Sequence, residues 1–400
     1  TTLARIIHRV EEAQDAKAKT QAFIDRFSKW YTPAVMVLAL AAGLISGDVV
    51  LGLTLLVIGC PGALVISIPV AIVAGIGRSA RNGILIKGGE YLETSAKISA
   101  VAVDKTGTLT EGRPVLTDIV VLNPEADRRE VLRWAAAAEA GSEHPLARPI
   151  LDTAREEGVA PEGLPGSVTP VVGKGIVADA HGKRVLIGNV PLLEQYGIVN
   201  DAGAAVAANK LAAAGKTPMI VAVDESVLGV IGVADTIRED APEMIRRLHA
   251  SGVQKVVMLT GDTRLVAEAI GEAVGIDEIH ASLLPEDKLD AVARLQREGH
   301  TVAMVGDGVN DAPALATADI GVAMGAAGSA VAVETADIAL MGDNLLKLPE
   351  AISLAKRTVN VMRQNIWIAL ITVVVLLVGV FAGGVTMAIG MLVHEGSVLI

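Results

Sequence analysis

The apolar residues of this 400-residue chain gather in long uncharged runs near both ends and in short runs between them. Residues 31–46 and 49–76 form two long runs, and residues 366–381 and 385–393 form two more. Because about 20 apolar residues in a helix cross a bilayer, these runs predict membrane-spanning helices, the last of them truncated. Residues 1–30 mix charged and apolar residues at helical spacing, which predicts a helix that leads to the membrane.

Basic residues flank the first two predicted spans. Arg26 and Lys29 precede the first, and Arg78, Arg81 and Lys87 follow the second. By the positive-inside tendency both flanks lie in the cytoplasm. We therefore expect a multi-pass protein of the cell membrane whose large central region is cytoplasmic.

The central region has apolar runs short enough for buried parallel strands. The runs 98–103, 256–259 and 302–305 each end at a polar loop, which is where open α/β sheets carry their chemistry. Between them, residues 120–234 have Gly/Pro-rich turns and short alternating runs, which favour a small α+β insertion. We therefore expect five segments in all: a first membrane region (1–97), an α/β domain in two pieces (98–119 and 235–345), the insertion (120–234), and a second membrane region (346–400).

Composition narrows the class of protein. A hydrophobic fraction of 52% and a mean hydropathy of +0.51 are too apolar for an ordinary soluble enzyme. The net charge of −11 argues against nucleic acid as a partner. Cys60 is the single cysteine, so no intrachain disulfide can form.

The strongest chemical signal directly follows the run 98–103. Residues 104–110 read Asp-Lys-Thr-Gly-Thr-Leu-Thr, beginning with Asp104, Lys105 and Thr106. A carboxylate at a strand end, beside a glycine turn whose backbone N–H groups face an anion, can attack a phosphoryl group. A lone Asp-Lys-Thr would be better explained as a helix cap with a solvated lysine. Seven residues in this order favour the nucleophile.

Other polar groups follow the later strands. Thr260, Gly261 and Asp262 follow the run 256–259, and Lys288 offers a point charge. Residues 306–313 read Gly-Asp-Gly-Val-Asn-Asp-Ala-Pro and place two carboxylates on one turn, suited to a hard cation such as Mg²⁺. An ordinary acidic turn is the alternative for that segment alone.

Together these motifs resemble the haloacid-dehalogenase-like, Rossmann-type phosphorylation domain of P-type ATPases. The resemblance implies that Asp104 is phosphorylated and that Thr106 and Asp307 help Asp104 hold Mg²⁺. It also implies that Thr260 and Lys288 bind phosphate. By the same resemblance Asn310 and Asp311 support the site. A soluble phosphatase of that superfamily usually has an acid where Thr106 stands, so a persistent phosphoenzyme is expected here.

The insertion carries a second resemblance. Ser142-Glu143-His144-Pro145-Leu146 with the later Gly173-Lys174-Gly175 is similar to the nucleotide-binding signature of the heavy-metal (P1B) subgroup. A lone His-Pro is more often structural, and Gly-x-Gly alone is weaker still. The resemblance implies that Glu143, His144, Gly173 and Gly175 bind ATP.

The predicted spans contain candidate ligands for a transported ion. Cys60 stands beside the helix-breaking Pro61, and the pair His394-Glu395 lies in the last apolar run, where ionisable groups are costly. A buried cysteine is usually only a small packing residue. The subgroup commonly has Cys-Pro-Cys, whereas this chain has Gly62, which makes Cu⁺ less favoured than borderline ions. We expect Cys60, His394 and Glu395 to meet in one site for Zn²⁺ or Cd²⁺, with Co²⁺ or Fe²⁺ as alternatives.

Zinc- and cadmium-type members of the subgroup usually have a lysine near the position of Val373 and an aspartate near that of His394. The chain begins at Thr1 without methionine and ends in an apolar run, so we expect a piece of a longer protein. By resemblance, an actuator domain and earlier membrane helices would precede it.

The expected function is ATP-driven metal transport through a phosphorylated Asp104. The partners are ATP, the transported ion and the bilayer. A membrane-anchored phosphatase would explain the cytoplasmic motifs but neither Thr106 nor Cys60. A catalytically inactive membrane scaffold or sensor would leave the phosphoryl-transfer motifs without a role.

Overall fold

The structure is a computed structural model that describes residues 19–142, 144, 146–198, 202–307, 311–325 and 336–397. Its described residues fall into two compact units. The first comprises Thr1–Val101, Arg247–Gln254 and Val292–Ile400, and the second comprises Ala102–Arg246 and Lys255–Ala291. The units are described separately below.

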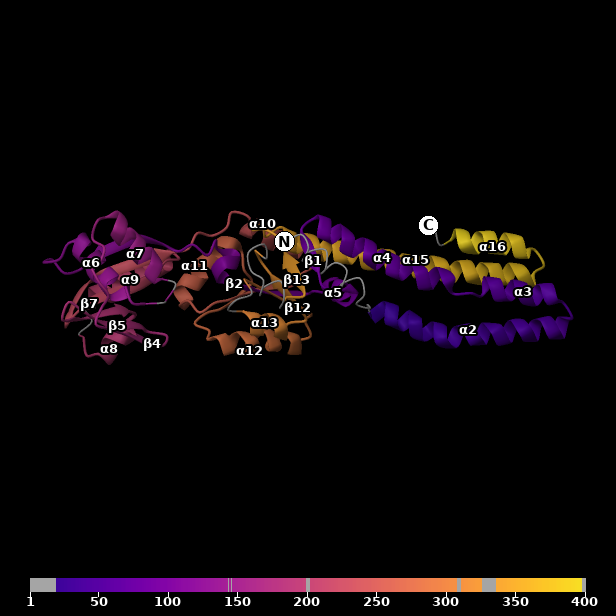
Figure 1. Ribbon diagram of the computed structural model, residues 1–400, viewed down its shortest axis with the longest axis horizontal. Helices are drawn as coiled ribbons and strands as arrows, with labels where there is room; N and C mark the ends of the chain where they lie inside the picture. The colour runs from indigo at the N-terminus through magenta and orange to yellow at the C-terminus, as the bar shows by residue number, and fades with distance from the viewer. Residues whose placement is uncertain are drawn as a thin grey trace. The chain divides into compact units, whose positions relative to one another are not determined.

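The apolar helices of the first unit form a bundle (Figure 1). They are α2 (Lys19–Ser46), α3 (Val49–Ile58), α4 (Gly62–Arg81), α15 (Lys347–Phe381) and α16 (Met387–Gly396). The Asp48 carboxylate caps α3 by accepting from Val50 N at 2.8 Å and Leu51 N at 3.2 Å. The run 49–76 is not one helix, because α3 ends before Cys60-Pro61 and α4 begins after it. Proline lacks the N–H that would continue the ladder, as the sequence predicted.

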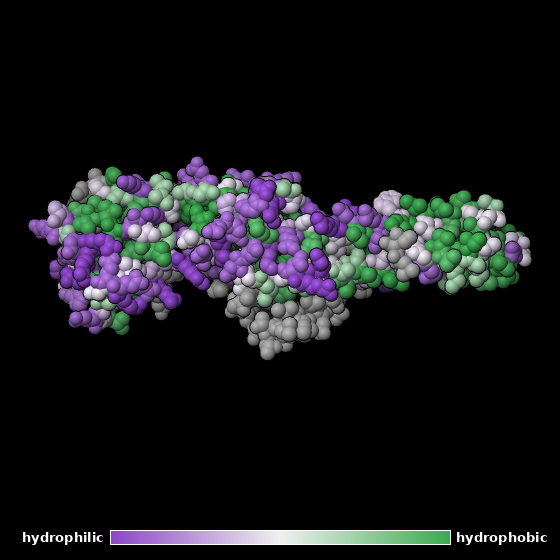
Figure 2. All heavy atoms as spheres, turned by 90° about the horizontal axis from the view of Figure 1, so that it is seen from above, coloured by the Kyte–Doolittle hydropathy of each residue, from purple (hydrophilic) through white to green (hydrophobic). Residues whose placement is uncertain are grey.

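Among the described residues, two helices are long and apolar enough to cross a membrane, within Ala22–Ser46 and Lys347–Phe381. A small core of Ala39, Leu55, Ile58, Leu376 and Val380 joins α2, α3 and α15. Most other large apolar side chains of these helices are exposed, and the surface of the helical bundle is accordingly mostly green, that is hydrophobic, in Figure 2. That distribution is typical of helices whose solvent is lipid.

A seven-stranded sheet has the strand order β1-β13-β12-β11-β2-β9-β10. The strands that the sequence predicted are present as β2 (Ala100–Asp104), β9 (Lys255–Leu259) and β11 (Val302–Gly306). β9–β10, β11–β12 and β12–β13 are parallel pairs, where β10 is Glu278–His280, β12 is Ile320–Ala323 and β13 is Ile338–Leu340. The helices that connect or flank these strands along the chain are α5 (Gly89–Ser95), α10 (Ala241–Ala250), α11 (Arg264–Val274), α12 (Pro285–Arg297) and α13 (Ala312–Thr317).

One edge strand of this sheet was not expected. β1 (Ile84–Ile86) lies within residues 1–97, which the sequence assigned to the first membrane region, yet it pairs antiparallel with β13. Its three residues are all buried. Because its partner lies some 250 residues later, no local pattern could reveal the pairing.

The second unit contains a six-stranded antiparallel sheet with the order β3-β8-β7-β6-β5-β4. α6 (Arg128–Glu139) and α7 (Ala147–Glu156) cover one face, where alternate residues such as Val185 and Ile187 point. α8 (Val190–Gln195) and α9 (Ala202–Ala213) cover the other face, where Leu186 points. The strands are β3 (Val115–Val121), β4 (Ser167–Val171), β5 (Gly175–Ala180), β6 (Lys183–Gly188), β7 (Thr217–Val223) and β8 (Ser226–Ala234).

Candidate functional site

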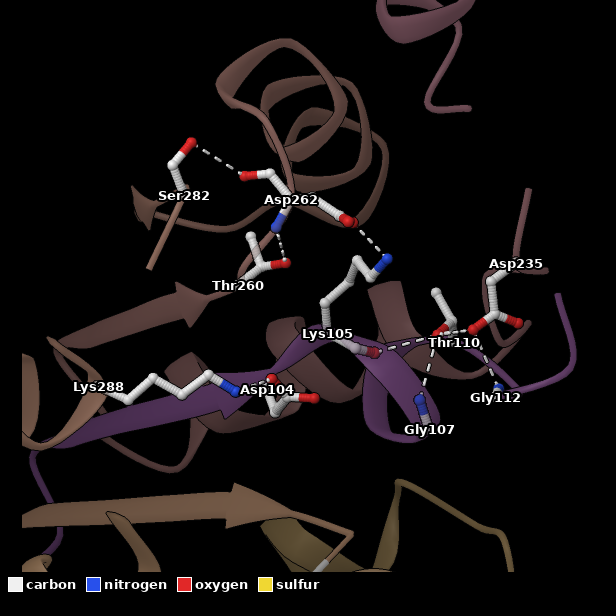
Figure 3. A network of polar contacts seen from close by, with 10 residues as sticks. All are labelled: Asp104, Lys105, Gly107, Thr110, Gly112, Asp235, Thr260, Asp262, Ser282 and Lys288. Atoms are coloured by element: carbon white, nitrogen blue, oxygen red, sulfur yellow. Dashed lines mark hydrogen bonds and ion pairs between the residues drawn. The ribbon is translucent and has the colours of Figure 1, made fainter. Parts of the chain in front are cut away.

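The nucleophile predicted from the sequence is the last residue of the buried strand β2. Asp104 is 7% exposed, and Lys288 donates from Nζ to its Oδ1 at 2.6 Å (Figure 3). Lys288 lies near the start of α12 and is itself largely buried. The ammonium of Lys288 therefore lies directly beside the carboxylate that would act as the nucleophile.

The turn after Asp104 is fixed by hydrogen bonds. Gly107 has φ +73°, a conformation that favours glycine, and its N–H donates to Thr110 Oγ1 at 3.3 Å. The Thr110 hydroxyl lies 3.1 Å from the Lys105 carbonyl and 2.5 Å from Asp235 Oδ2. The turn thereby holds its shape close to the nucleophile.

Asp235 is a residue that the sequence reasoning missed. Its carboxylate also accepts from Gly112 N at 3.1 Å (Figure 3) and from Arg113 N at 3.0 Å. Arg238 reinforces the contact by donating from Nε to the Thr110 carbonyl at 3.1 Å. The signal available in the sequence was an aspartate directly after a long apolar strand, β8.

The polar residues after β9 lie close to the nucleophile loop. The Lys105 ammonium forms an ion pair with Asp262, and Asp262 N donates to Thr260 Oγ1 at 3.1 Å. Thr260 is 3% exposed. Ser282 N donates to the Asp262 carbonyl at 2.7 Å, which ties this turn to the chain before α12. Thr260, Asp262 and Lys288 are thus brought together with Lys105 and Asp104, and Gly261 lies on the same turn (Figure 3).

The second carboxylate motif follows β11. Asp307 is half-buried, and Asp311 is 2% exposed at the start of α13. A Cβ on Gly306 would lie 2.7 Å from Asp311 Oδ2, so glycine is needed there. Asn310 lies outside the described residues, and Thr106 is exposed in the turn after Asp104.

His144 begins a separate candidate site on the insertion. Leu146 N donates to His144 Nδ1 at 3.3 Å, which places the ring proton on Nε2. The residue is exposed at its edge, but the surrounding chain desolvates the imidazole and lowers its pKa. The ring therefore offers a neutral N–H donor at pH 7. The adjacent Glu143 lies outside the described residues.

Glu139, at the end of α6, was not singled out from the sequence. It is 4% exposed, and burial raises the pKa of its carboxyl, opposed by a hydrogen bond with Ser142. Its Oε2 has no hydrogen-bond partner among the described residues. A buried acid with an unused oxygen, five residues before His144, is suited to a polar ligand.

The two glycines of Gly173-Lys174-Gly175 have different roles. Gly175 has φ +138°, and a Cβ there would lie 2.1 Å from the Ile187 carbonyl oxygen, so only glycine fits. Gly173 has φ +71° with open space around it. Asn189 fixes the loop: its Nδ2 donates to the Gly173 carbonyl at 3.0 Å, and its N to the Lys174 carbonyl at 2.9 Å.

The candidate ion ligands meet only in part. Cys60 and His394 line one cavity of about 30 Å³, together with Tyr31 and Val373. His394 is 2% exposed and its Nδ1 has no hydrogen-bond partner among the described residues. This cavity is large enough for one water molecule or one ion.

The structure does not bring Glu395 to this cavity, so its part in the site stays a prediction. Glu395 is exposed and does not line the cavity. Successive residues of a helix point about 100° apart, so His394 and Glu395 face different directions here. Among the described residues, no group of three or more His, Cys, Asp and Glu side chains could hold a metal ion.

Comparison with known proteins defines the family. Residues 98–319 match the family model of the haloacid dehalogenase-like hydrolases, which is more than half of the chain. The chain belongs to the haloacid dehalogenase-like hydrolases. Within that family, its similarity over the full length to heavy-metal-transporting P-type ATPases confirms the resemblance that the Asp104 motif indicated.

Two relatives and one solved structure illustrate the similarity. A probable cadmium-transporting ATPase of Staphylococcus aureus (strain MRSA252) is 44% identical over 415 residues, covering 100% of this chain and 57% of that protein. A zinc-exporting P-type ATPase of Mycobacterium marinum (strain ATCC BAA-535 / M) is 42% identical over 99% of this chain and 54% of its own length. A crystal structure of a zinc-transporting PIB-type ATPase in the E2.Pi state matches with 43% identity and a TM-score of 0.73, covering 99% of this chain and 65% of that one.

The predicted fold class is confirmed: an α-helical membrane-type bundle with a haloacid-dehalogenase-like domain and an inserted α+β domain. The chain spans little more than half the length of these curated relatives.

Proposed function

We propose that the protein to which this chain belongs exports a divalent transition metal by hydrolysing ATP, through an aspartyl phosphate at Asp104. The observation that carries the proposal is the buried Asp104 carboxylate, paired with Lys288 beside a rigid turn. An Asp104 oxygen bonds to the γ-phosphorus of ATP while the bond to the bridging oxygen breaks and ADP leaves. Lys288 offsets charge on the transferred group.

The neighbouring groups have supporting roles in this proposal. Lys105, Thr260, Gly261 and Asp262 shape the phosphate site, and Asn310 and Asp311 support the loop after β11. Asp104, Thr106 and Asp307 supply hard oxygen donors that fit Mg²⁺, which would neutralise phosphate charge when bound.

We assign ATP binding to the insertion, at Glu143, His144, Gly173 and Gly175. Glu139 adds a buried acceptor and Asn189 holds the glycine loop. The neutral His144 ring supplies a donor and a flat surface for a base. This insertion has only Trp134 and Tyr196 as aromatic residues, so an alternative aromatic platform is sparse.

For the ion, Cys60 and His394 supply sulfur and nitrogen at one cavity. This pair favours Zn²⁺ or Cd²⁺, with Co²⁺ or Fe²⁺ possible, over Mg²⁺ or Ca²⁺. The names of the two relatives described above specify cadmium and zinc and support these two ions, whereas other relatives of 42% identity are named as manganese-exporting. Helices α2, α3, α4, α15 and α16 would lie in the cell membrane, and the segments 98–119, 120–234 and 235–345 in the cytoplasm.

The test is phosphoenzyme formation by the full-length protein with radioactive γ-phosphate ATP across a panel of metal ions. We expect labelling that Zn²⁺ or Cd²⁺ stimulates, that Asp104→Asn abolishes, and whose metal dependence Cys60→Ala and His394→Ala remove. ATP binding should persist in the last two variants. Labelling of Asp104→Asn would refute the nucleophile. Metal-independent phosphate release without stable labelling would favour the membrane-anchored phosphatase.

A further inference from the structure

A large polar pocket in the first unit has no role in the proposed transport chemistry. Its cavity of about 720 Å³ lies among the last turn of α4, the end of α10 and the first half of α15. Four basic side chains line it, against the single acid Glu350. The basic residues are Arg78, Arg247, Lys347 and Arg357.

The polar contacts inside this pocket hold the lysine and the acid in place. Lys347 donates from Nζ to the Asn82 carbonyl at 2.5 Å, and the Asn82 amide donates to Glu350 Oε1. The side chains of Arg78 and Arg357 are exposed, and among the described residues neither guanidinium group has a hydrogen bond or ion pair. Two uncommitted guanidinium groups beside a fixed ammonium make a site for an anion with several oxygens, such as phosphate.

Exposed valines lie on the two helices that carry Arg78 and Arg357, within one or two turns of these residues. A Cβ on Gly75 would lie 2.7 Å from Thr358 Oγ1, so α4 and α15 pack together one residue beyond Arg357. Toward the apolar ends of both helices, Val73 is 40% and Val361 is 44% exposed. Val361 is four residues after Arg357 and therefore on the same face of α15.

We propose that this pocket binds the phosphate headgroup of an anionic phospholipid, with an acyl chain against Val361. Arg78 and Arg357 contact the phosphodiester, and Lys347 contributes positive charge. The proposal depends on the membrane placement proposed above, but not on transport or ATP hydrolysis. A free phosphate shares the guanidinium contacts but gains nothing from the exposed valines.

The test is native mass spectrometry of the full-length protein in detergent, titrated with phosphatidylglycerol or phosphatidylcholine, without ATP or metal. We expect tighter binding of phosphatidylglycerol. Because a basic residue near a membrane surface contributes about 1 kcal/mol, Arg78→Gln and Arg357→Gln should each weaken it about fivefold, and the double variant about 25-fold. Arg81→Gln is the matched control, since Arg81 is on the last turn of the same helix but does not line the pocket.

Three outcomes would overturn the proposal. They are equal binding of the two lipids, wild-type affinity in the double variant, and an equal loss in Arg81→Gln. Complete displacement of the lipid by a tenfold excess of inorganic phosphate would assign the pocket to free phosphate instead. An unchanged melting temperature of the variants without lipid would show that they fold, so that a lost lipid would report the pocket itself.

Discussion

Asp235 offers the sharpest test of how the phosphorylation loop is held. It is a positioning residue, because its carboxylate contacts Thr110, Gly112 and Arg113. Asp235→Asn keeps the shape of the side chain but removes the charge. It also turns an N–H₂ group toward one of the donors that the carboxylate now accepts.

The cost follows from these contacts. Hydrogen bonds to a charged acceptor contribute about 1.5–3 kcal/mol each, and neutral ones about 0.5–1.5 kcal/mol. With one bond lost and the others weakened, the ordered loop loses about 3 kcal/mol. Since 1.36 kcal/mol is a factor of ten, a loss of about 3 kcal/mol should slow phosphorylation by roughly a hundredfold or slightly more.

The assay is an acid-quenched time course of phosphoenzyme formation by the full-length protein, beside equilibrium ATP binding. We expect slower phosphorylation with unchanged ATP affinity, because His144 and the glycine loop are far along the chain from Asp235. Asp224→Asn is the control: Asp224 lies on the β7–β8 turn and accepts one backbone hydrogen bond, from Arg184 N at 3.1 Å. If Asp235→Asn phosphorylates at the wild-type rate, the loop does not depend on these contacts.

Three further predictions concern the insertion and the nucleotide site proposed on it. His144→Ala should weaken ATP affinity but spare phosphorylation of Asp104 by inorganic phosphate. Because the pKa of His144 is lowered in the folded protein, its contribution to stability is present above about pH 6.5 and is lost as the pH falls through the folded pKa. The melting temperature of the variant should therefore depend less on pH than that of the wild type. The pKa of Glu139 is raised in the folded protein, so stability falls as the pH rises through that folded pKa. Glu139→Gln should therefore raise the melting temperature at pH 7.5 and reduce ATP affinity. An unchanged ATP affinity would make Glu139 purely structural. Gly175→Ala should lower the free energy of unfolding of the insertion by about 3 kcal/mol or more, because the new Cβ would clash with the Ile187 carbonyl. Gly173→Ala, at a position with open space, should lower it by about 1–2 kcal/mol. Equal losses of unfolding free energy for the two variants in urea would contradict this geometry.

The sequence predicted those elements of the fold that local pattern encodes. The apolar runs before Asp104, Thr260 and Asp307 gave three strands correctly, because β-branched runs that end in polar loops are typical of a buried parallel sheet. Strand β1 was missed because only pairing with β13 makes three apolar residues a strand. The insertion was expected as α+β, but its strand order depends on contacts that the pattern does not contain.

The candidate sites show the same division. Asp104 and Lys288 could be proposed from the sequence because each belongs to, or accompanies, a contiguous motif that follows an apolar run. Asp235 and Asn189 were missed because they act by holding backbone groups of another segment. Hydrogen bonds between segments far apart in the sequence have no local signature, so residues that make them can be recognised only in the folded structure.

At the cavity that Cys60 and His394 line, two residues that are adjacent in the sequence have different surroundings. His394 and Glu395 were paired because both are ionisable in an apolar run, yet helical rotation separates adjacent side chains. Cys60 and His394, more than 300 residues apart, line one cavity because Pro61 interrupts the helix and leaves the thiol at the break. One thiol and one imidazole leave the coordination of a Zn²⁺ ion incomplete, since such ions usually take four ligands. The remaining donors would be water or other groups, and the hydroxyl of Tyr31, which lines the same cavity, can be tested by Tyr31→Phe. Unaltered metal-stimulated phosphorylation in that variant would exclude the phenol as a ligand and leave water as the remaining donor from within the cavity.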